Sequence, residues 1–163
     1  MIDIRRATTA DAPGIARVHQ RSHIETYMPI FGGDYSGPSL AERELHWRTR
    51  LQASDLAFVA VADGEIIGFT HALETEDGGA LLTTLYLLAK WHRQGIGRDL
   101  FSHIRALMHE RGHAAMRFGV LPTNAAAIAF YQSQGARPLG HVVSDHGGEP
   151  HDDILFEIKT GPY

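Results

Sequence analysis

Two glycines, Gly95 and Gly97, stand where an apolar run gives way to a helical repeat. They follow His92, Arg93 and Gln94 in the segment LYLLAKWHRQGIGRDLFSHI. A strand that enters a helix through a glycine turn presents several free backbone N–H groups at one point, and the helix dipole adds about half a positive charge there. Because glycine has no Cβ, a phosphate can approach this backbone closely. The segment therefore predicts a phosphate-binding turn.

Other interpretations of the same turn stand beside phosphate binding. The dinucleotide-binding fingerprint requires a further glycine where this chain has Leu100, and the phosphate-loop motif requires Gly-Lys-Ser/Thr, which is absent. A tight strand-to-helix turn that holds no ligand explains the glycines equally well. The spacing of Gly95 and Gly97 alone therefore does not decide between a binding site and a structural turn.

Hydrophobic patterning places this turn within a mixed α/β fold. Apolar alternation or short apolar runs predict strands, apolar residues at helical spacing predict helices, and Asp63-Gly64 is typical of a hairpin turn. Strands are expected at 2–7, 56–62, 65–73, 80–88, 114–121, 138–144 and 153–159, and helices after Thr8 or Thr9, from Ser39 to about Leu51, from Ile96 to Gly112 and at 124–134. The segment 24–38, rich in Gly, Pro and aromatic residues, is expected to be irregular and to line a pocket. This order predicts a sheet with helices on both faces.

The composition is that of an ordinary globular domain. The chain has 163 residues, 44% hydrophobic and 21% charged, and its formal net charge of −4 gives no sign of a nucleic-acid-binding face. The absence of cysteine excludes disulfides, thiolate metal sites and a cysteine nucleophile. No segment approaches the ~20 apolar residues that span a bilayer, and MIDIRRATTAD has no apolar signal core, so a cytoplasmic location is expected. A single domain over residues 1–163 is the default at this length.

Eleven histidines make a metal site worth testing. The His-Glu-x-x-His motif of metalloproteases is absent, and His141, His146 and His151 lie at irregular spacing around a Gly-rich turn. Solvent exposure or a polar pocket rim explains such a cluster better than a metal does. We therefore expect no metal.

The segment LYLLAKWHRQGIGRDLF resembles the acetyl-CoA signature of the GNAT superfamily of N-acetyltransferases, a strand followed by Arg/Gln-x-x-Gly-x-Gly/Ala and a helix. Residues 124–135, NAAAIAFYQSQG, resemble the second signature of that superfamily, Asn-x-x-Ala-x-x-Phe-Tyr-x-x-x-Gly. The element order is similar over nearly the whole chain. One departure is His92, which stands where the family usually has Arg or Gln. The resemblance implies a mixed, mostly antiparallel sheet of about seven strands, splayed at an acetyl-CoA cleft.

The same resemblance implies how acetyl-CoA is held. The pyrophosphate is expected on the backbone amides from about Arg93 to Arg98, and the pantetheine arm is expected to pair like an extra strand with Leu85 to Leu87. The backbone N–H of Leu87 is expected to bind the thioester carbonyl in the manner of an oxyanion hole. The complete expected cofactor-binding set is Leu85, Tyr86, Leu87, His92, Arg93, Gln94, Gly95, Ile96, Gly97, Arg98 and Asn124. Asn124 is equally expected to be the N-cap of its helix.

Direct acetyl transfer to an amine needs a neutral amine, a stabilised oxyanion and a proton for the leaving thiolate. The resemblance implies that Tyr131 donates this proton, although Tyr131 could also be a core aromatic like Phe130. Relatives often carry a carboxylate on the preceding strand, where this chain has Thr83 and Thr84. A water chain is therefore a candidate for the base, as are Glu74, His71, Glu25 and His141.

The acceptor pocket implied by the resemblance is walled by Tyr27, Phe31 and His141. The leading hypothesis is an acetyl-CoA-dependent N-acetyltransferase that acts on the primary amine of a small molecule. The alternatives are an enzyme that acts on a protein or peptide N-terminus and a non-catalytic acetyl-CoA-binding sensor module. No nucleic-acid or membrane partner is expected, and a homodimer is an option because the family often dimerises through its last strands.

Overall fold

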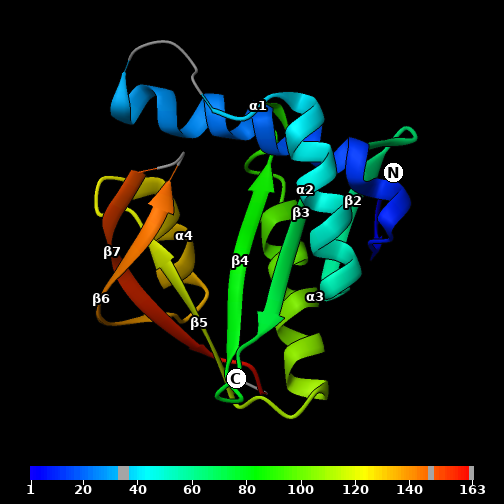
Figure 1. Cartoon of the computed structure of the whole chain (residues 1–163). Coiled ribbons are helices and arrows are strands. Elements are labelled where there is room, and N and C mark those ends of the chain that lie inside the picture. The colour runs from blue at the N-terminus through cyan, green and yellow to red at the C-terminus, as the bar shows by residue number, and fades with distance from the viewer. Residues whose placement is uncertain (33–36, 147–148, 162–163) are drawn as a thin grey trace. The chain divides into compact units, whose positions relative to one another are not determined.

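The computed structural model describes residues 1–32, 37–146 and 149–161, without the side chains of Phe31, Asp145, His146 and Glu149. Its strands are β1 (Ile2–Arg6), β2 (Ala57–Ala62), β3 (Glu65–Glu74), β4 (Ala80–Leu87), β5 (Ala115–Val120), β6 (Arg137–His146) and β7 (Glu149–Lys159). Its helices are α1 (Ala12–Phe31), α2 (Leu40–Ala53), α3 (Ile96–Glu110) and α4 (Ala125–Ser133), with the 3₁₀ turns η1 (Thr9–Asp11) and η2 (Ala89–Trp91). The predicted order of strands and helices is confirmed (Figure 1).

The strands form a seven-stranded sheet in the order β1-β2-β3-β4-β5-β7-β6. The pairs β1–β2, β2–β3, β5–β7 and β6–β7 are antiparallel, whereas β4 and β5 are parallel, with Leu81 opposite Arg117. The expected mixed, mostly antiparallel α/β fold is therefore confirmed. The chain divides into two compact units, unit 1 (Met1–Leu73 with Thr83–Ile104) and unit 2 (Glu74–Leu82 with Arg105–Tyr163).

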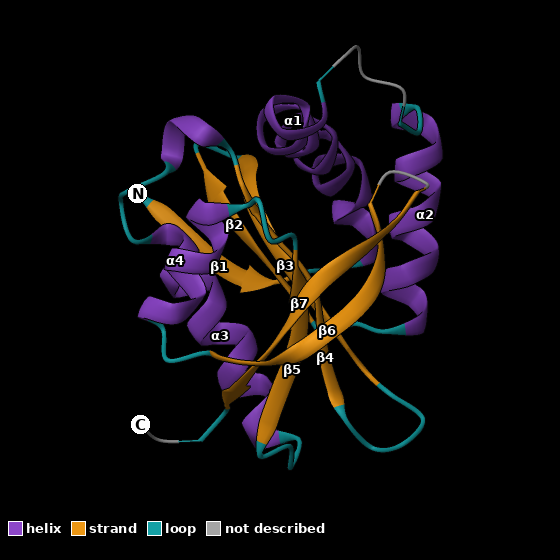
Figure 2. Ribbon diagram, turned by 90° about the vertical axis from the view of Figure 1, so that its left-hand side faces the viewer, coloured by secondary structure: helices purple, strands orange, loops and turns teal. Residues whose placement is uncertain are grey.

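In unit 1 the side chains of β2 alternate between the two faces of the sheet, as the strand period of two requires. Val59 belongs to a buried cluster with Trp47 of α2 and Ile15 of α1. Phe58 lies on the other face, where its ring centroid is 5.2 Å from that of His103 on α3. In Figure 2, α1 and α2 accordingly lie on one side of β1–β3 and the first turns of α3 on the other. Helices on both faces are thus confirmed for this unit.

Unit 2 buries one face of its strands under α4. Phe118 of β5 and Phe156 of β7 are stacked at 5.9 Å between ring centroids, and Tyr131 of α4 lies 4.3 Å from Phe118. The neighbouring strand residues Arg117 and Glu157 point to the opposite face, where they form an ion pair of 3.1 Å. This second face carries an ion pair, whereas the face under α4 is aromatic.

Local signals in the sequence account for several element ends. The hairpin turn at Asp63-Gly64 has φ of 51° and 81°, the left-handed pair that a tight hairpin requires. Ser39 caps α2 by accepting the Glu42 backbone N–H at 3.2 Å, as predicted. The second hydrogen bond expected of a capping box, from the Ser39 N–H to the Glu42 side chain, is not formed among the described residues. Within this same part of the chain, no helix is both long enough and apolar enough to cross a membrane.

The segment 24–31 is helical, which corrects the prediction of irregular structure. Pro29 lies in the last turn of α1, so it removes only the hydrogen bond that its N–H would have made to the Glu25 carbonyl. Tyr27, in this part of the helix, is buried within unit 1. The helix ends at Gly32, whose φ is 73°. Packing of the apolar side of α1 therefore overrides the helix-breaking signal of the proline. The rest of the predicted irregular segment includes residues 33–36, which lie outside the described residues.

Candidate active site

Two left-handed residues frame the glycine turn. β4 ends at Leu87, η2 follows, and α3 begins at Ile96. In the connection, φ is 65° at Arg93 and 82° at Gly95. A left-handed backbone is easy for glycine but uncommon for arginine, and such strained residues concentrate at functional sites. Apart from its neighbours in the chain, a Cβ at Gly95 would meet only the Arg98 guanidinium, at 3.6 Å, so the described residues leave open space at the turn.

The first turn of α3 presents a row of backbone donors. The first helical hydrogen bond runs from the Asp99 N–H to the Gly95 carbonyl at 3.0 Å. Across the described part of the chain, the N–H groups of Gly95, Ile96, Gly97 and Arg98 donate to no protein acceptor. Four open donors at the positive end of a helix dipole suit an anion. The geometry of the turn therefore fits the diphosphate that the sequence resemblance implies.

The end of β4 directs alternate backbone groups toward β3 and away from it. Three contacts join this part of β4 to β3: Thr84 O accepts from Thr70 Oγ1 at 2.9 Å, Leu88 N donates to Ile67 O at 3.0 Å, and Tyr86 O lies close to Gly68. Since the backbone groups of successive residues in a strand point to opposite edges, those of Leu85 and Leu87 point away from β3. These are the residues expected to pair with the pantetheine arm.

His92 and Glu25 bind the backbone where β4 passes into η2. The His92 Nε2 lies 2.7 Å from the Leu87 carbonyl oxygen. Glu25 of α1 accepts the Ala89 N–H at 2.9 Å through Oε2, and its Oε1 is held by Arg21 at 2.9 Å. Glu25 is thus a hydrogen-bonded structural carboxylate, which disfavours its candidacy as the catalytic base.

An aromatic group in unit 1 contains one of the predicted acceptor-pocket residues. The Tyr27 hydroxyl lies 3.4 Å from the Tyr86 hydroxyl, and the Tyr86 ring is stacked on His19 with centroids 5.1 Å apart. The structure therefore brings Tyr27 of α1 next to Tyr86 of β4, which is a predicted cofactor-binding residue. His23 joins the group, with its ring 5.0 Å from that of Tyr27. His19 and His23 were not singled out by the sequence, although their spacing of four residues places them on one side of a helix.

Two histidines in unit 1, the partly buried His19 and the fully buried His71, favour the neutral form. Trp47 Nε1 donates to His19 Nδ1 at 2.9 Å, and burial, followed by the nearby Arg43 charge, lowers the pKa of His19 to about 3. His71 Nδ1 lies 2.7 Å from Thr83 Oγ1, and burial, followed by the Arg50 charge, lowers the pKa of His71 to about 4. His71 has no exposed surface, so this candidate base has no access to a substrate amine in the structure.

In unit 2 the second signature forms a capped helix. Asn124 Oδ1 accepts the Ala127 N–H at 3.2 Å, so the N-cap role expected of Asn124 is present. Tyr131 is 9% exposed, and its ring packs on Phe118. Gly135, with φ of 97°, follows the helix as predicted. The packing of the Tyr131 ring and the chemistry expected of its hydroxyl are compatible, because they use different parts of the side chain.

The other expected residues are dispersed. Glu74 accepts from His113 Nε2 at 2.8 Å and from Arg111, and the His113 bond, followed by Arg111, lowers the pKa of Glu74. His141 is exposed on β6, 3.6 Å from Asp152. The backbone of Phe31 ends α1, whereas its side chain lies outside the described residues. In the described part of the chain, no group of three His, Asp or Glu side chains could hold a metal ion.

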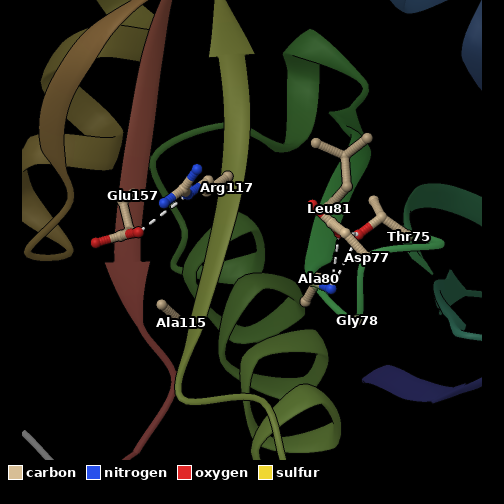
Figure 3. A pocket seen from close by; sticks show the side chains of 9 residues that line it. Thr75, Asp77, Gly78, Ala80, Leu81, Ala115, Arg117 and Glu157 are labelled. Carbon is tan, nitrogen blue, oxygen red and sulfur yellow. Dashed lines mark hydrogen bonds and ion pairs between the residues drawn. The ribbon is translucent and has the colours of Figure 1, made fainter.

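A cavity of about 380 Å³ in unit 2 contains none of the predicted site residues. Arg117 and Glu157 stand on one side of it, and Asp77 and Leu81 on the other (Figure 3). The Arg117 bond, followed by that of Arg137, lowers the pKa of Glu157, so this carboxyl is an ion-pair partner rather than a proton acceptor. Sequence patterning gave no signal for this cavity, because its residues come from β4, β5, β7 and the turn before β4.

The predicted residues thus fall into two sets. Unit 1 holds the segment from Leu85 to Arg98 together with Tyr27, and unit 2 holds Asn124, Tyr131 and His141. In unit 1 the expected contacts are mostly backbone groups, whereas in unit 2 they are side chains.

Known proteins share both the sequence and the fold. The acetyltransferase (GNAT) family matches residues 21–136. An uncharacterised N-acetyltransferase of Bacillus subtilis is 32% identical over 139 residues, covering 82% of this chain and 79% of its own. The ribosomal protein bS18-alanine N-acetyltransferase of Escherichia coli is 28% identical over 135 residues, covering 83% and 80%. The structure of the PaiA N-acetyltransferase of Thermoplasma acidophilum in complex with coenzyme A aligns with a TM-score of 0.72 and 26% identity, over 98% of this chain and 99% of that one.

The family match covers the glycine turn and the whole Asn124–Gly135 segment, which are the two places where the backbone geometry suits a coenzyme and a capped helix. The relative from Bacillus subtilis extends the likeness over four fifths of the chain. This chain therefore belongs to the GNAT family and is an N-acetyltransferase.

Proposed function

We propose that this enzyme transfers the acetyl group of acetyl-CoA directly to the primary amine of a small molecule, through one catalytic domain over residues 1–163. The proposal is carried by the strand–turn–helix segment from Leu85 to Arg98, with its four open amides at the start of α3. The coenzyme A in the Thermoplasma acidophilum relative supports the choice of cosubstrate.

The backbone of unit 1 would hold the coenzyme. The amides of Gly95 to Arg98 would bind the diphosphate, aided by the charges of Arg93 and Arg98. The backbone groups of Leu85 and Leu87, which point away from β3, would pair with the amide groups of the pantetheine arm. The Leu87 N–H would then stabilise the negative oxygen that forms on the thioester carbon.

Transfer requires no covalent enzyme intermediate. The neutral amine attacks the thioester carbon, the C–S bond breaks, and the thiolate takes a proton from the Tyr131 hydroxyl. The acylated nitrogen then loses a proton, which passes through water and restores that hydroxyl. An alkylammonium has a pKa of about 10, so its proton must leave before attack. We propose that water accepts this proton, because His71 is buried and Glu25 and Glu74 are engaged in hydrogen bonds.

The acceptor would lie against Tyr27 and Tyr86, whose hydroxyls are 3.4 Å apart. Phe31 and His141 are the further residues proposed to line its pocket. Hydroxyl and imidazole groups suit a modest polar amine. A second candidate acceptor is the N-terminal amine of a protein, because the Escherichia coli relative is named for an alanine of a ribosomal protein.

The test is thiol release from acetyl-CoA with a panel of amines that includes polyamines, amino acids, aminoglycosides and alanine-terminated peptides. Turnover with a small amine supports the proposal, and turnover with the peptides alone supports the second candidate. Tight binding of acetyl-CoA without thiol release on any amine would instead indicate a non-catalytic coenzyme-binding module.

We further propose that the enzyme works in the cytoplasm without nucleic-acid or membrane partners and that it forms homodimers through β6. This strand is at the edge of the sheet and exposes Val143 by 70% and Leu139 by 42%. Exposed edge strands with apolar side chains favour pairing with another chain. Light scattering of the wild type and of Val143→Lys would test the dimer, which the lysine should dissociate.

A further inference from the structure

The imidazole of His92 contacts the end of β4, the strand that precedes it. Its Nε2 is 2.7 Å from the Leu87 carbonyl oxygen, five residues earlier in the chain. A carbonyl oxygen only accepts, so the hydrogen of this bond is on Nε2. The ring is exposed, and an exposed hydrogen bond adds little to the free energy of folding. The contact therefore holds a local geometry rather than the fold.

The backbone group that His92 holds belongs to the residue expected to face the thioester. Thr84 and Leu88 direct their bonded backbone groups toward β3, so both the C=O and the N–H of Leu87 point the other way. These two groups flank one Cα. A hydrogen bond to the C=O consequently restricts rotation of the Leu87 backbone and, with it, the direction of the N–H.

The first residue of η2 is held by a different side chain. Glu25 accepts the Ala89 N–H at 2.9 Å and is itself held by Arg21. Leu88, the residue that joins β4 to η2, thus lies between an anchored Leu87 carbonyl and an anchored Ala89 amide. This double attachment leaves the end of β4 little freedom to twist.

We propose that His92 is a positioning residue for acetyl transfer, which fixes the Leu87 peptide so that its N–H is aimed at the developing oxyanion. The inference rests on the proposed function. A preorganised donor stabilises a transition state because no reorganisation is needed at the moment of reaction, and small misplacements of such groups are costly. His92 touches neither substrate in this role and acts through Leu87.

An opposite role, direct contact of His92 with the coenzyme diphosphate, predicts different kinetics. It would require the ring to leave Leu87, and its loss would weaken coenzyme binding and raise KM. Loss of a positioning residue should lower kcat with little change in the KM for acetyl-CoA. The two roles can therefore be separated by measurement.

His92→Gln and His92→Asn form a matched pair. The Gln amide nitrogen is as many bonds from Cα as the His Nε2, so it can reach the Leu87 carbonyl, whereas the Asn nitrogen is one bond too short. With acetyl-CoA and the amine that gives the fastest thiol release, His92→Asn should lower kcat about tenfold, the order expected for a displaced oxyanion donor. Its KM for acetyl-CoA should stay within about threefold, and His92→Gln should restore kcat to within about threefold of the wild type.

A spectroscopic measurement on the free protein adds a second readout. The carbonyl ¹³C resonance of Leu87 should move in His92→Asn and stay near its wild-type position in His92→Gln. An unchanged kcat in His92→Asn, or a raised KM with kcat intact, would overturn the positioning role. If the wild type releases no thiol with any of the amines, the proposed function itself is contradicted. This outcome differs from an active wild type whose His92 variants have unchanged kcat, which contradicts only the positioning role.

Discussion

Unit 1 contains two histidines whose pKa is lowered by burial, whereas unit 2 contains a carboxyl, Glu157, whose pKa is lowered by ion pairs with two arginines. His71 is fully buried and His19 partly buried in unit 1, and this burial lowers the pKa of each well below the ordinary value for histidine. In unit 2, Glu157 pairs with Arg117 and Arg137 at 3.1 and 3.2 Å. Groups that stay neutral in the folded protein make the free energy of unfolding depend on pH. Exposed ion pairs add little to the free energy of unfolding.

The two units also differ in the chemistry proposed for them. Unit 1 offers backbone amides at Leu87 and from Gly95 to Arg98, and unit 2 offers the side chains of Asn124 and Tyr131. Only a proline removes a backbone N–H, whereas any larger side chain can fill the space in front of it. The comparison therefore predicts that a steric change disables the coenzyme site of unit 1, while a loss of one hydroxyl suffices in unit 2.

The largest effect is expected from Gly97→Val. Gly97 lies in the first turn of α3, and a branched side chain there would occupy the space that the diphosphate needs, so affinity for coenzyme A should fall by about 100-fold or more. Ala106→Val, at an exposed position of the same helix, is the control and should bind like the wild type. Calorimetry measures both affinities. Retained affinity in a folded Gly97→Val protein would show that the turn is only structural.

Tyr131→Phe tests the side-chain contribution of unit 2. The phenylalanine ring keeps the packing on Phe118 but loses the proton donor, so kcat should fall by about 10- to 100-fold. Affinity for acetyl-CoA, measured by calorimetry, should change little. Thiol release at saturating substrate gives kcat, and a value equal to that of the wild type would remove Tyr131 from the mechanism.

Acidification should destabilise the protein through the buried histidines. The unfolded chain takes up protons as the pH falls below about 6.5, whereas folded His19 and His71 stay neutral down to about 3 and about 4. Stability should thus be lost as the pH falls, by up to about 1.4 kcal/mol per pH unit for each histidine. Urea unfolding at pH 7, 6 and 5 measures the slope, which should be shallower in His71→Asn. A free energy of unfolding that is constant over this range would contradict the assignment of buried neutral rings.

The smallest effect is expected at Asn124, where capping and coenzyme contact can be separated. Asn124→Ala removes the cap and should cost about 1 kcal/mol of stability, whereas Asn124→Asp keeps an acceptor for the Ala127 N–H. Denaturant unfolding should place the aspartate variant near the wild type. If Asn124 also contacts the coenzyme through its amide nitrogen, Asn124→Asp will have normal stability but reduced affinity for coenzyme A, whereas Asn124→Ala will lose both.

Local sequence signals predicted much of the fold. The Asp63-Gly64 turn and the Ser39 and Asn124 caps act over two to four residues, so their physical cause is contained in the sequence nearby. The helical segment around Pro29 could not be predicted in this way. Its conformation depends on burial of Tyr27 against residues far along the chain.

The candidate site shows the same division. The glycine turn was predictable because the function proposed for it uses backbone groups, and Gly95 and Gly97 mark where the backbone is open. The contacts of Glu25 with Ala89 and of Tyr27 with Tyr86 join residues 64 and 59 positions apart. No pattern within α1 indicates such partners, and the neutral state of His19 likewise depends on Trp47 from another helix.

Calorimetric titration of coenzyme A and of pantetheine into the wild-type protein tests the central claim, that backbone amides at the start of α3 bind the diphosphate. Coenzyme A should bind with a saturable heat, and pantetheine, which lacks the diphosphate, should bind about 100-fold more weakly or not at all. No heat with coenzyme A, or equal affinity for both compounds, would contradict the claim.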